Sequence, residues 1–272
     1  MTAVLPFFDF DSIDDWNPFL SETLSGIVPI EAIMQSQSTP PEYIEDARDL
    51  VIRNIRVDKK RLYGAVESWL CERPFRAYHG TRLFPDELNS IQQKGLVPTT
   101  IQDRVNRTKR VLQEHPDWNQ LRLRFEPALH EFLNKHHQKV RAGQVHLTIS
   151  RGGVTHGFNH YLVYGAEFDQ RFIQLLTAQG RADIMKRGTT PYLLTFEMPG
   201  DVAVDRMIAY ANKFAAIRNG EPFDLIRKLI GHWAWKQFFP EFSSGTQEED
   251  LGLVFYEIVR PEWLVRAEEI QI

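Results

Sequence analysis

A tyrosine, a histidine and a glycine stand in a row at Tyr78, His79 and Gly80, at the end of a short apolar run. Each ring nitrogen of an imidazole can donate or accept a hydrogen bond, so a histidine at a strand end can hold a hydroxyl group. A glycine carries no side chain, so its backbone N–H and C=O can approach a flat polar group closely. Taken alone, such a histidine is more often a satisfied structural residue, and the surrounding sequence has to decide.

The surrounding elements place this trio between a strand and a helix. The segment 75–81 has the pattern of a short strand. Pro85, Asp86 and Glu87 are typical of a first helical turn, with proline at its start and acids near the positive end of the helix. Leu88 and Ile91 are expected to face inward, and Gly95 is a natural helix end. The sequence therefore predicts strand, helix and glycine stop.

Taken whole, the segment YHGTRLFPDELNSIQQKGL resembles the first motif of ADP-ribosyltransferases of the diphtheria-toxin and poly(ADP-ribose) polymerase type, the His-Tyr-Glu group. The resemblance implies a protein that uses NAD⁺ as co-substrate, as a toxin-like bacterial member would. It assigns Tyr78 to the NAD site, His79 to a ribose hydroxyl and Gly80 to the nicotinamide carboxamide. Thr81 would support the loop or a ribose hydroxyl, and Arg82 would meet a phosphate.

The family's second motif places a tyrosine ring against the nicotinamide. Here 145–150 is the expected strand, and the helical pattern after it carries Tyr161 and Tyr164. The run Tyr164-Gly-Ala-Glu resembles the family's tyrosine followed by small residues, so Tyr164 is the first choice for the stack and Tyr161 the second. The expected strand itself, VHLTIS, lacks the aromatic residue often found there. Either tyrosine could equally be part of a helix core.

The family's third motif is a glutamate near a late strand, whose carboxylate bonds the ribose 2′-hydroxyl and stabilises an oxocarbenium-like transition state. A polar segment, FSSGTQEED, precedes the expected strand 251–259. Its Gln247-x-Glu249 resembles the Gln-x-Glu of some toxin branches, in which a preceding aromatic, here Phe242, touches the target. Glu249 is the first choice, then Glu248. Glu257, expected inside the strand, is the other candidate, and an acidic loop is usually only a solvated surface.

The acceptor of the ADP-ribose is indicated less clearly. A basic helical insertion at about 102–142 carries Arg104, Arg107, Lys109 and Arg110, with Trp118 and Phe125 nearby. Basic residues with aromatics can bind nucleic acid through phosphate contacts and stacking, so RNA or DNA is favoured slightly over a protein side chain. A solvated helix face with long arginine stems explains the same pattern.

Composition limits the remaining classes. The 272 residues carry a formal net charge of −4 and 43% hydrophobic residues, which favours a globular protein without a global nucleic-acid or membrane signature. Cys71 is the only cysteine, so an intrachain disulfide is excluded. His156 and His160 lack the glutamate of a zinc-protease helix, and Gly157 weakens a helix there, so no metal is expected. A cytoplasmic protein without a membrane segment is expected.

These patterns together predict an α+β protein with an ADP-ribosyltransferase-like split core of mixed or antiparallel strands. A mostly helical N-terminal extension, 1–72, would precede a catalytic domain, 73–272, into which the basic helices are inserted. By family analogy, a toxin or defence role implies an inhibitory partner such as an antitoxin or chaperone. Two other classes stay open, a catalytically inactive NAD- or nucleic-acid-binding module and an enzyme that removes a 2′-phosphate from RNA with NAD⁺.

Overall fold

The structure is a computed structural model that describes residues 7–136, 142–177, 184–215, 224–246 and 251–272. Helices and strands are mixed along the chain, which confirms the expectation of an α+β protein. The described strands form a five-stranded sheet in the order β4-β2-β1-β3-β5. They are β1 (Pro74–Leu83), β2 (Val145–Thr148), β3 (Thr190–Pro199), β4 (Gly252–Phe255) and β5 (Leu264–Glu269). No helix in the described ranges is long and apolar enough to cross a lipid bilayer.

The chain divides into two compact units, each assembled from three separate stretches. Unit 1 contains Met1–Ala77, Thr148–Gly152 and Glu197–Leu253, and unit 2 contains Tyr78–Leu147, Gly153–Phe196 and Val254–Ile272. The expected N-terminal extension, 1–72, therefore belongs to unit 1 in full. Unit 1 also takes Glu197–Leu253 from the expected catalytic domain. The histidine and tyrosines singled out above all belong to unit 2.

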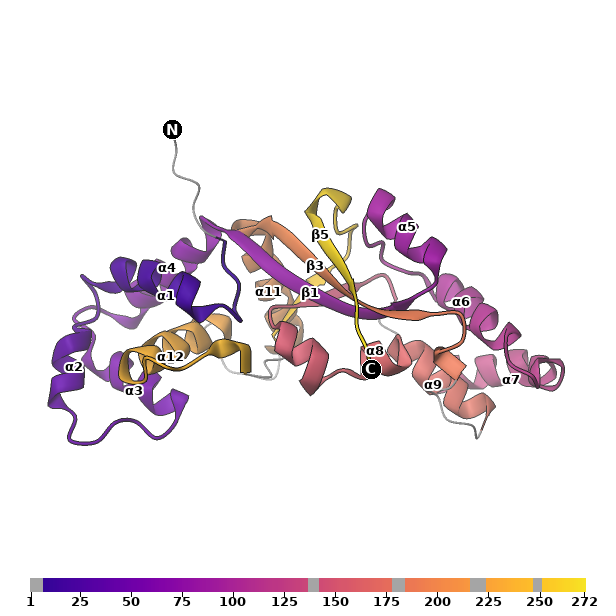
Figure 1. The fold of residues 1–272 in the computed structure, drawn as a ribbon, viewed down its shortest axis with the longest axis horizontal. Helices are drawn as coiled ribbons and strands as arrows, with labels where there is room; N and C mark the ends of the chain where they lie inside the picture. The colour runs from indigo at the N-terminus through magenta and orange to yellow at the C-terminus, as the bar shows by residue number, and fades with distance from the viewer. Residues whose placement is uncertain (1–6, 137–141, 178–183, 216–223, 247–250) are drawn as a thin grey trace. The chain divides into compact units, whose positions relative to one another are not determined.

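Unit 1 is a helical assembly with an aromatic core. Its helices are α1 (Ile13–Leu24), α2 (Ile30–Ser36), α3 (Ile44–Asn54), α4 (Lys59–Cys71), α11 (Gly200–Ala215) and α12 (Asp224–Phe238). Figure 1 shows α12 alongside α3, and α1 also packs on α4. Between α1, α4 and β1, the ring of Phe8 lies 5.0 Å from Phe75 and 5.9 Å from Trp69. Asp58 separates α3 from α4, because it caps the start of α4 by accepting from the backbone N–H of Arg61.

Unit 2 carries the helices that follow the tyrosine-histidine-glycine segment. They are α5 (Pro85–Lys94), α6 (Ile101–Gln113), α7 (Trp118–His136), α8 (His160–Tyr164) and α9 (Glu167–Leu176). The helix predicted from Pro85 to Gly95 is confirmed, and Gly95 ends it with φ +82°. α6 and α7 both pack on α9 (Figure 1). Four rings, those of Phe125, Phe132, Phe168 and Phe172, join α7 to α9 with centroids 5.0–5.9 Å apart.

Three features differ from the sequence prediction. The single helix expected after Asn159 is two helices, because Gly165 ends α8 with φ +74°, a conformation that residues with a side chain rarely adopt. The strand expected over 251–259 ends at Phe255, so Glu257 follows β4 instead of lying within it. β5, which was not predicted, pairs antiparallel with β3 through residues such as Leu194 and Ala267.

Candidate functional site

His79 lies in β1 and is oriented by a backbone carbonyl. Its Nδ1 is 2.8 Å from the carbonyl oxygen of His146, the second residue of β2. A carbonyl can only accept, so Nδ1 carries the proton and Nε2 of the neutral ring is the acceptor. Burial lowers the pKa of His79, while the bond to the His146 carbonyl acts in the opposite direction. A neutral imidazole of this tautomer can accept a hydrogen bond from a hydroxyl group at Nε2.

Gly80 is a position where a side chain does not fit. A Cβ atom built there would lie 2.4 Å from Cγ1 of Val154 and 3.3 Å from Leu162. Val154 belongs to the π-helical turn η2 (Gly153–Gly157), a type of turn that occurs frequently at functional sites. Glycine at this position thus allows β1 to approach both η2 and α8. The side chains of Val154 and Leu162 fill the space beside Gly80.

The three tyrosines of the predicted site differ in their surroundings. Tyr78 is buried in a small cluster with Val154, Leu162 and Leu193, so it is a core residue. Tyr161 donates its hydroxyl to Glu167 at 3.0 Å, and its ring lies 4.2 Å from that of His160. Tyr164 is the last residue of α8 and is partly exposed.

Tyr161 and Tyr164 are therefore both carried by α8, the helix that packs Leu162 against Gly80. Unit 2 thus brings the expected histidine, glycine and tyrosines to adjoining elements. Thr81 follows in β1 and is partly buried.

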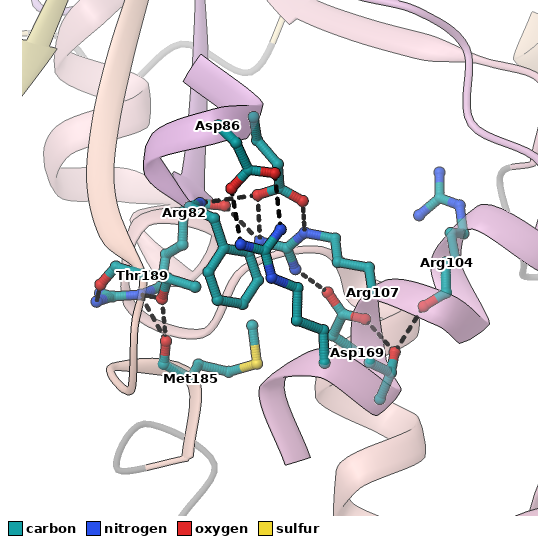
Figure 2. A network of polar contacts seen from close by, with 11 residues as sticks. Arg82, Asp86, Arg104, Arg107, Asp169, Met185 and Thr189 are labelled. Carbon is teal, nitrogen blue, oxygen red and sulfur yellow. Dashed lines mark hydrogen bonds and ion pairs between the residues drawn. The ribbon is translucent and has the colours of Figure 1, made fainter. Parts of the chain in front are cut away.

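Arg82 has a different role from the phosphate contact that we expected. It is 3% exposed, and each nitrogen of its guanidinium donates to the protein itself. Nη1 donates to the Leu162 carbonyl at 3.0 Å, and Nη2 to the Thr189 carbonyl at 2.7 Å. Nε donates to the Thr189 hydroxyl at 3.0 Å and to the Met185 carbonyl at 3.2 Å (Figure 2). Because its donors are used internally, Arg82 is a structural residue in this arrangement.

Arg107 extends this buried network to three helices (Figure 2). Its guanidinium donates to the Arg82 carbonyl at 2.6 Å, to Asp169 of α9 at 2.6 Å and to Glu87 of α5 at 2.9 Å. Asp169 also accepts the hydroxyl of Thr108. Burial acts to lower the pKa of Arg107, but the carboxylates of Asp169 and Glu87 raise it above its usual range. Arg107 is thus committed to a buried ion pair.

The other basic residues of the predicted acceptor surface also have local contacts. Lys109 pairs with Glu126 at 2.7 Å, and Arg110 forms a two-pronged pair with Asp86 at 2.7 and 2.8 Å. The guanidinium of Arg110 also stacks on the ring of Phe84 at 3.7 Å. In Figure 2 the guanidinium of Arg104 points away from the buried network. Arg107, Lys109 and Arg110 therefore each have a carboxylate partner, which reduces the positive charge of this face.

The carboxylate of the third motif is the part of the site on which the structure says least. Gln247, Glu248 and Glu249 lie outside the described residues. Glu257 is exposed and follows the end of β4. Phe242, in unit 1, lies with its ring 5.7 Å from that of His232, and its carbonyl accepts from Lys236. The assignment of the catalytic carboxylate therefore remains a prediction.

Asp11 is a buried carboxylate that the sequence analysis did not single out. Within unit 1 it accepts from the backbone N–H of Arg151 and from the hydroxyl of Ser150 at 3.0 Å. Burial raises the pKa of Asp11 to about 6, and these hydrogen bonds only partly oppose that effect. Asp11 therefore holds the backbone of residues 150–151 against the segment before α1, within unit 1. Asp11 was not singled out from the sequence, because residues 1–45 show no clear helical or strand periodicity.

A cleft of about 430 Å³ in unit 1 lies apart from these residues in sequence. It is lined by 71–74, including Cys71, and by 197–200. Burial, reinforced by nearby acids such as Glu67, raises the pKa of the Cys71 thiol, which makes it a poor nucleophile. Arg73 folds back onto α4, where it donates to the Trp69 carbonyl at 2.7 Å. The cleft therefore combines no set of groups that points to a reaction.

Comparison with known proteins adds no family. No protein-family model, no curated protein and no solved structure matches the chain. The motif around His79 and the geometry of unit 2 therefore carry the functional assignment.

Proposed function

We propose that the protein binds NAD⁺ and transfers its ADP-ribose to a macromolecular acceptor, with His79 holding a hydroxyl of the nicotinamide ribose. The observation that carries this proposal is the tautomer of His79. Its Nδ1–H is used on the His146 carbonyl, so Nε2 can accept from a ribose hydroxyl. Gly80 beside it and Tyr164 on α8, the helix packed against Gly80, support the same arrangement. In finer terms, we propose that the sheet and its helices form an ADP-ribosyltransferase-like core.

The reaction requires little covalent chemistry from the protein. The bond between ribose C1′ and the nicotinamide nitrogen breaks, its electron pair leaves with neutral nicotinamide, and a nucleophile of the acceptor bonds to C1′ and loses a proton. Positioning the bent dinucleotide and stabilising the cationic ribose supply the rate acceleration. By resemblance, a carboxylate, first Glu249, then Glu248 or Glu257, would stabilise that cation. No metal enters this mechanism.

We propose a macromolecular acceptor and rank nucleic acid and protein equally. The expectation of RNA or DNA depended on free basic residues, and Arg107, Lys109 and Arg110 each pair with a carboxylate. Exposed pairs of this kind contribute only about 0–1 kcal/mol, so a polyanion can displace those of Lys109 and Arg110, whereas the buried pair of Arg107 is not available. A protein side chain is therefore an equal candidate. The cytoplasmic toxin or defence role and an inhibitory partner belong to the same proposal.

The test follows NAD⁺ that is labelled in its adenylate part. Purified protein is incubated with it and with RNA, single-stranded DNA or lysate protein, and nicotinamide release is measured in parallel. We expect label in one acceptor pool, lost in His79→Ala and retained in Arg260→Lys, which changes an exposed arginine of the same unit. NAD⁺ binding without release in the wild type would favour the inactive binding module, and a cyclic phosphorylated ADP-ribose product would favour the RNA 2′-phosphotransferase. Absence of NAD⁺ binding would refute the proposal.

A further inference from the structure

The short helix α8 has backbone carbonyls that its own turns do not satisfy. It spans only His160–Tyr164, and the last four carbonyls of any α-helix lack partners within it. The carbonyl of Tyr161 accepts from the N–H of Gly165. The carbonyl of Leu162 instead accepts from Nη1 of Arg82, which lies three residues after His79 in β1. One hydrogen bond from a buried side chain thus joins the strand of the histidine to the helix of the tyrosines.

Arg82 is an unusual choice for such a link, because its acceptors are all uncharged. The carbonyls of Leu162, Met185 and Thr189 and the Thr189 hydroxyl take its donors, although it is 3% exposed. A buried cation without a carboxylate partner is tolerated only where its hydrogen bonds are well satisfied. A planar guanidinium fixes the directions of its donors, so these acceptors must keep a defined position around it.

Arg107 fixes the backbone of Arg82 from the other side. It donates to the Arg82 carbonyl, and it is itself held by Glu87 and the nearly fully buried Asp169 (Figure 2). The two arginines therefore form a chain of contacts from α5, α6 and α9 through the end of β1 to α8. A second contact fixes the end of α8, because the amide of Gln170 donates to the Gly165 carbonyl at 2.6 Å.

We infer that Arg82 is a positioning residue that sets α8, and with it Tyr164, relative to His79. This inference builds on the proposed function, because it identifies what holds the tyrosine in place for NAD⁺. Arg82 itself would contact neither substrate nor acceptor. Lysine at this position keeps the charge but cannot serve the Leu162 carbonyl and both acceptors of Thr189 with the same fork of donors.

The test compares Arg82→Lys with Arg110→Lys, which changes an exposed arginine of the same unit. Backbone amide hydrogen exchange is measured first, because it requires no substrate. We expect exchange over 161–165 to rise by about tenfold or more in Arg82→Lys and to stay unchanged in Arg110→Lys, with α3 and α12 unaffected in both. Unchanged exchange over 161–165 in a folded Arg82→Lys would overturn the inference. If that variant does not fold, Thr189→Val removes one acceptor of Nε and is expected to raise exchange over the same residues less strongly.

The second arm measures the KM for NAD⁺ and the kcat of nicotinamide release. Arg82→Lys is expected to raise KM by about tenfold, and to cost less than about threefold when Tyr164 is already alanine, because coupled residues do not add. Equal losses with and without the Tyr164 ring would overturn the positioning role. A wild type that binds no NAD⁺ would refute the proposed function instead, while the exchange result still decides whether Arg82 holds α8.

Discussion

The guanidinium of Arg82 donates a hydrogen bond to the carbonyl oxygen of Leu162 at 3.0 Å, and the side chain of the same leucine packs against the position of Gly80. One residue of α8 is therefore held twice by β1, once through its backbone and once through its side chain. Both contacts come from residues that follow His79 in β1, and they fix the helix whose tyrosines the histidine is expected to work with.

Gly80→Ala is expected to destabilise the protein by overpacking. The added methyl would lie 2.4 Å from Cγ1 of Val154, closer than carbon atoms can approach. Overpacking of this kind typically costs about 1–3 kcal/mol. Chemical denaturation of Gly80→Ala and of Gly80→Ala/Val154→Ala checks this, since the second change opens space and should restore part of the loss. Gly80→Ala as stable as the wild type would contradict the packing described here.

Asp169→Asn is expected to cost about 1.5–3 kcal/mol, because it removes the nearly fully buried carboxylate that pairs with Arg107, while Glu87 remains as a second partner. The matched control is Asp86→Asn, which breaks the exposed pair with Arg110 and should cost much less, because exposed ion pairs contribute little to stability. Thermal and urea unfolding of both variants measures the difference. Equal effects of the two substitutions would show that the buried network contributes no more than a surface pair.

Substitutions at the two tyrosines are expected to have different effects, on NAD⁺ binding at Tyr164 and on stability at Tyr161. Tyr164→Phe keeps a ring for stacking and should bind NAD⁺ within about threefold of the wild type, whereas Tyr164→Ala should lose about tenfold, a ring contact of roughly 1.4 kcal/mol. Tyr161→Phe removes the hydroxyl that donates to Glu167, which should cost about 0.5–1.5 kcal/mol of stability. Calorimetric binding of NAD⁺ and thermal unfolding distinguish them. Stronger loss of NAD⁺ binding in Tyr161→Ala than in Tyr164→Ala would reverse the assignment.

Asp11 is expected to make the free energy of unfolding fall as the pH rises. Burial raises its pKa to about 6 in the folded state, so the folded protein holds a proton there that the unfolded chain releases at lower pH. This contribution is fully present below the ordinary pKa of an aspartate and is lost as the pH rises through about 6. Asp9 lies near enough to add to the upward shift.

The measurement is the free energy of unfolding of the wild type and of Asp11→Asn between pH 4 and pH 7.5. The wild type should lose stability relative to Asp11→Asn across that interval, because asparagine has no proton to release. A difference that does not change with pH would mean that Asp11 ionises as an ordinary aspartate does.

The sequence predicted those elements whose ends are marked by local residues. β1 and α5 were found because Pro85 and Gly95 mark the start and end of the helix that follows the strand. The break between α8 and α9 was missed because helical spacing continues across Gly165, and only its positive φ reveals the turn. The N-terminal extension was expected to be mostly helical, but the bounds of α1 and α2 were not predicted, because their apolar residues are mixed with Ser, Thr and Pro.

The candidate site was predictable in its residue types and less so in their roles. His79 and Gly80 stood out through their spacing, whereas the role of Arg82 depends on acceptors 80 and 107 positions further along the chain. An arginine after a nucleotide-type motif favours a phosphate contact as long as those acceptors are unknown. Similarly, the basic pattern of α6 contained no information that Glu87, Asp169, Asp86 and Glu126 would be its partners.

The segment before α1 is held by hydrogen bonds to residues that are synthesised much later. Asp11 needs the hydroxyl of Ser150, and the carbonyl of Phe10 accepts the hydroxyl of Ser244, which also receives the N–H of Ile13. During synthesis the N-terminus emerges first, yet these contacts can form only when residue 244 is available. Pairing over such separations is slow because loop closure precedes any gain in contacts. A chain that stops before residue 244 would therefore leave this junction open, and only a chain that contains Ser244 can close it.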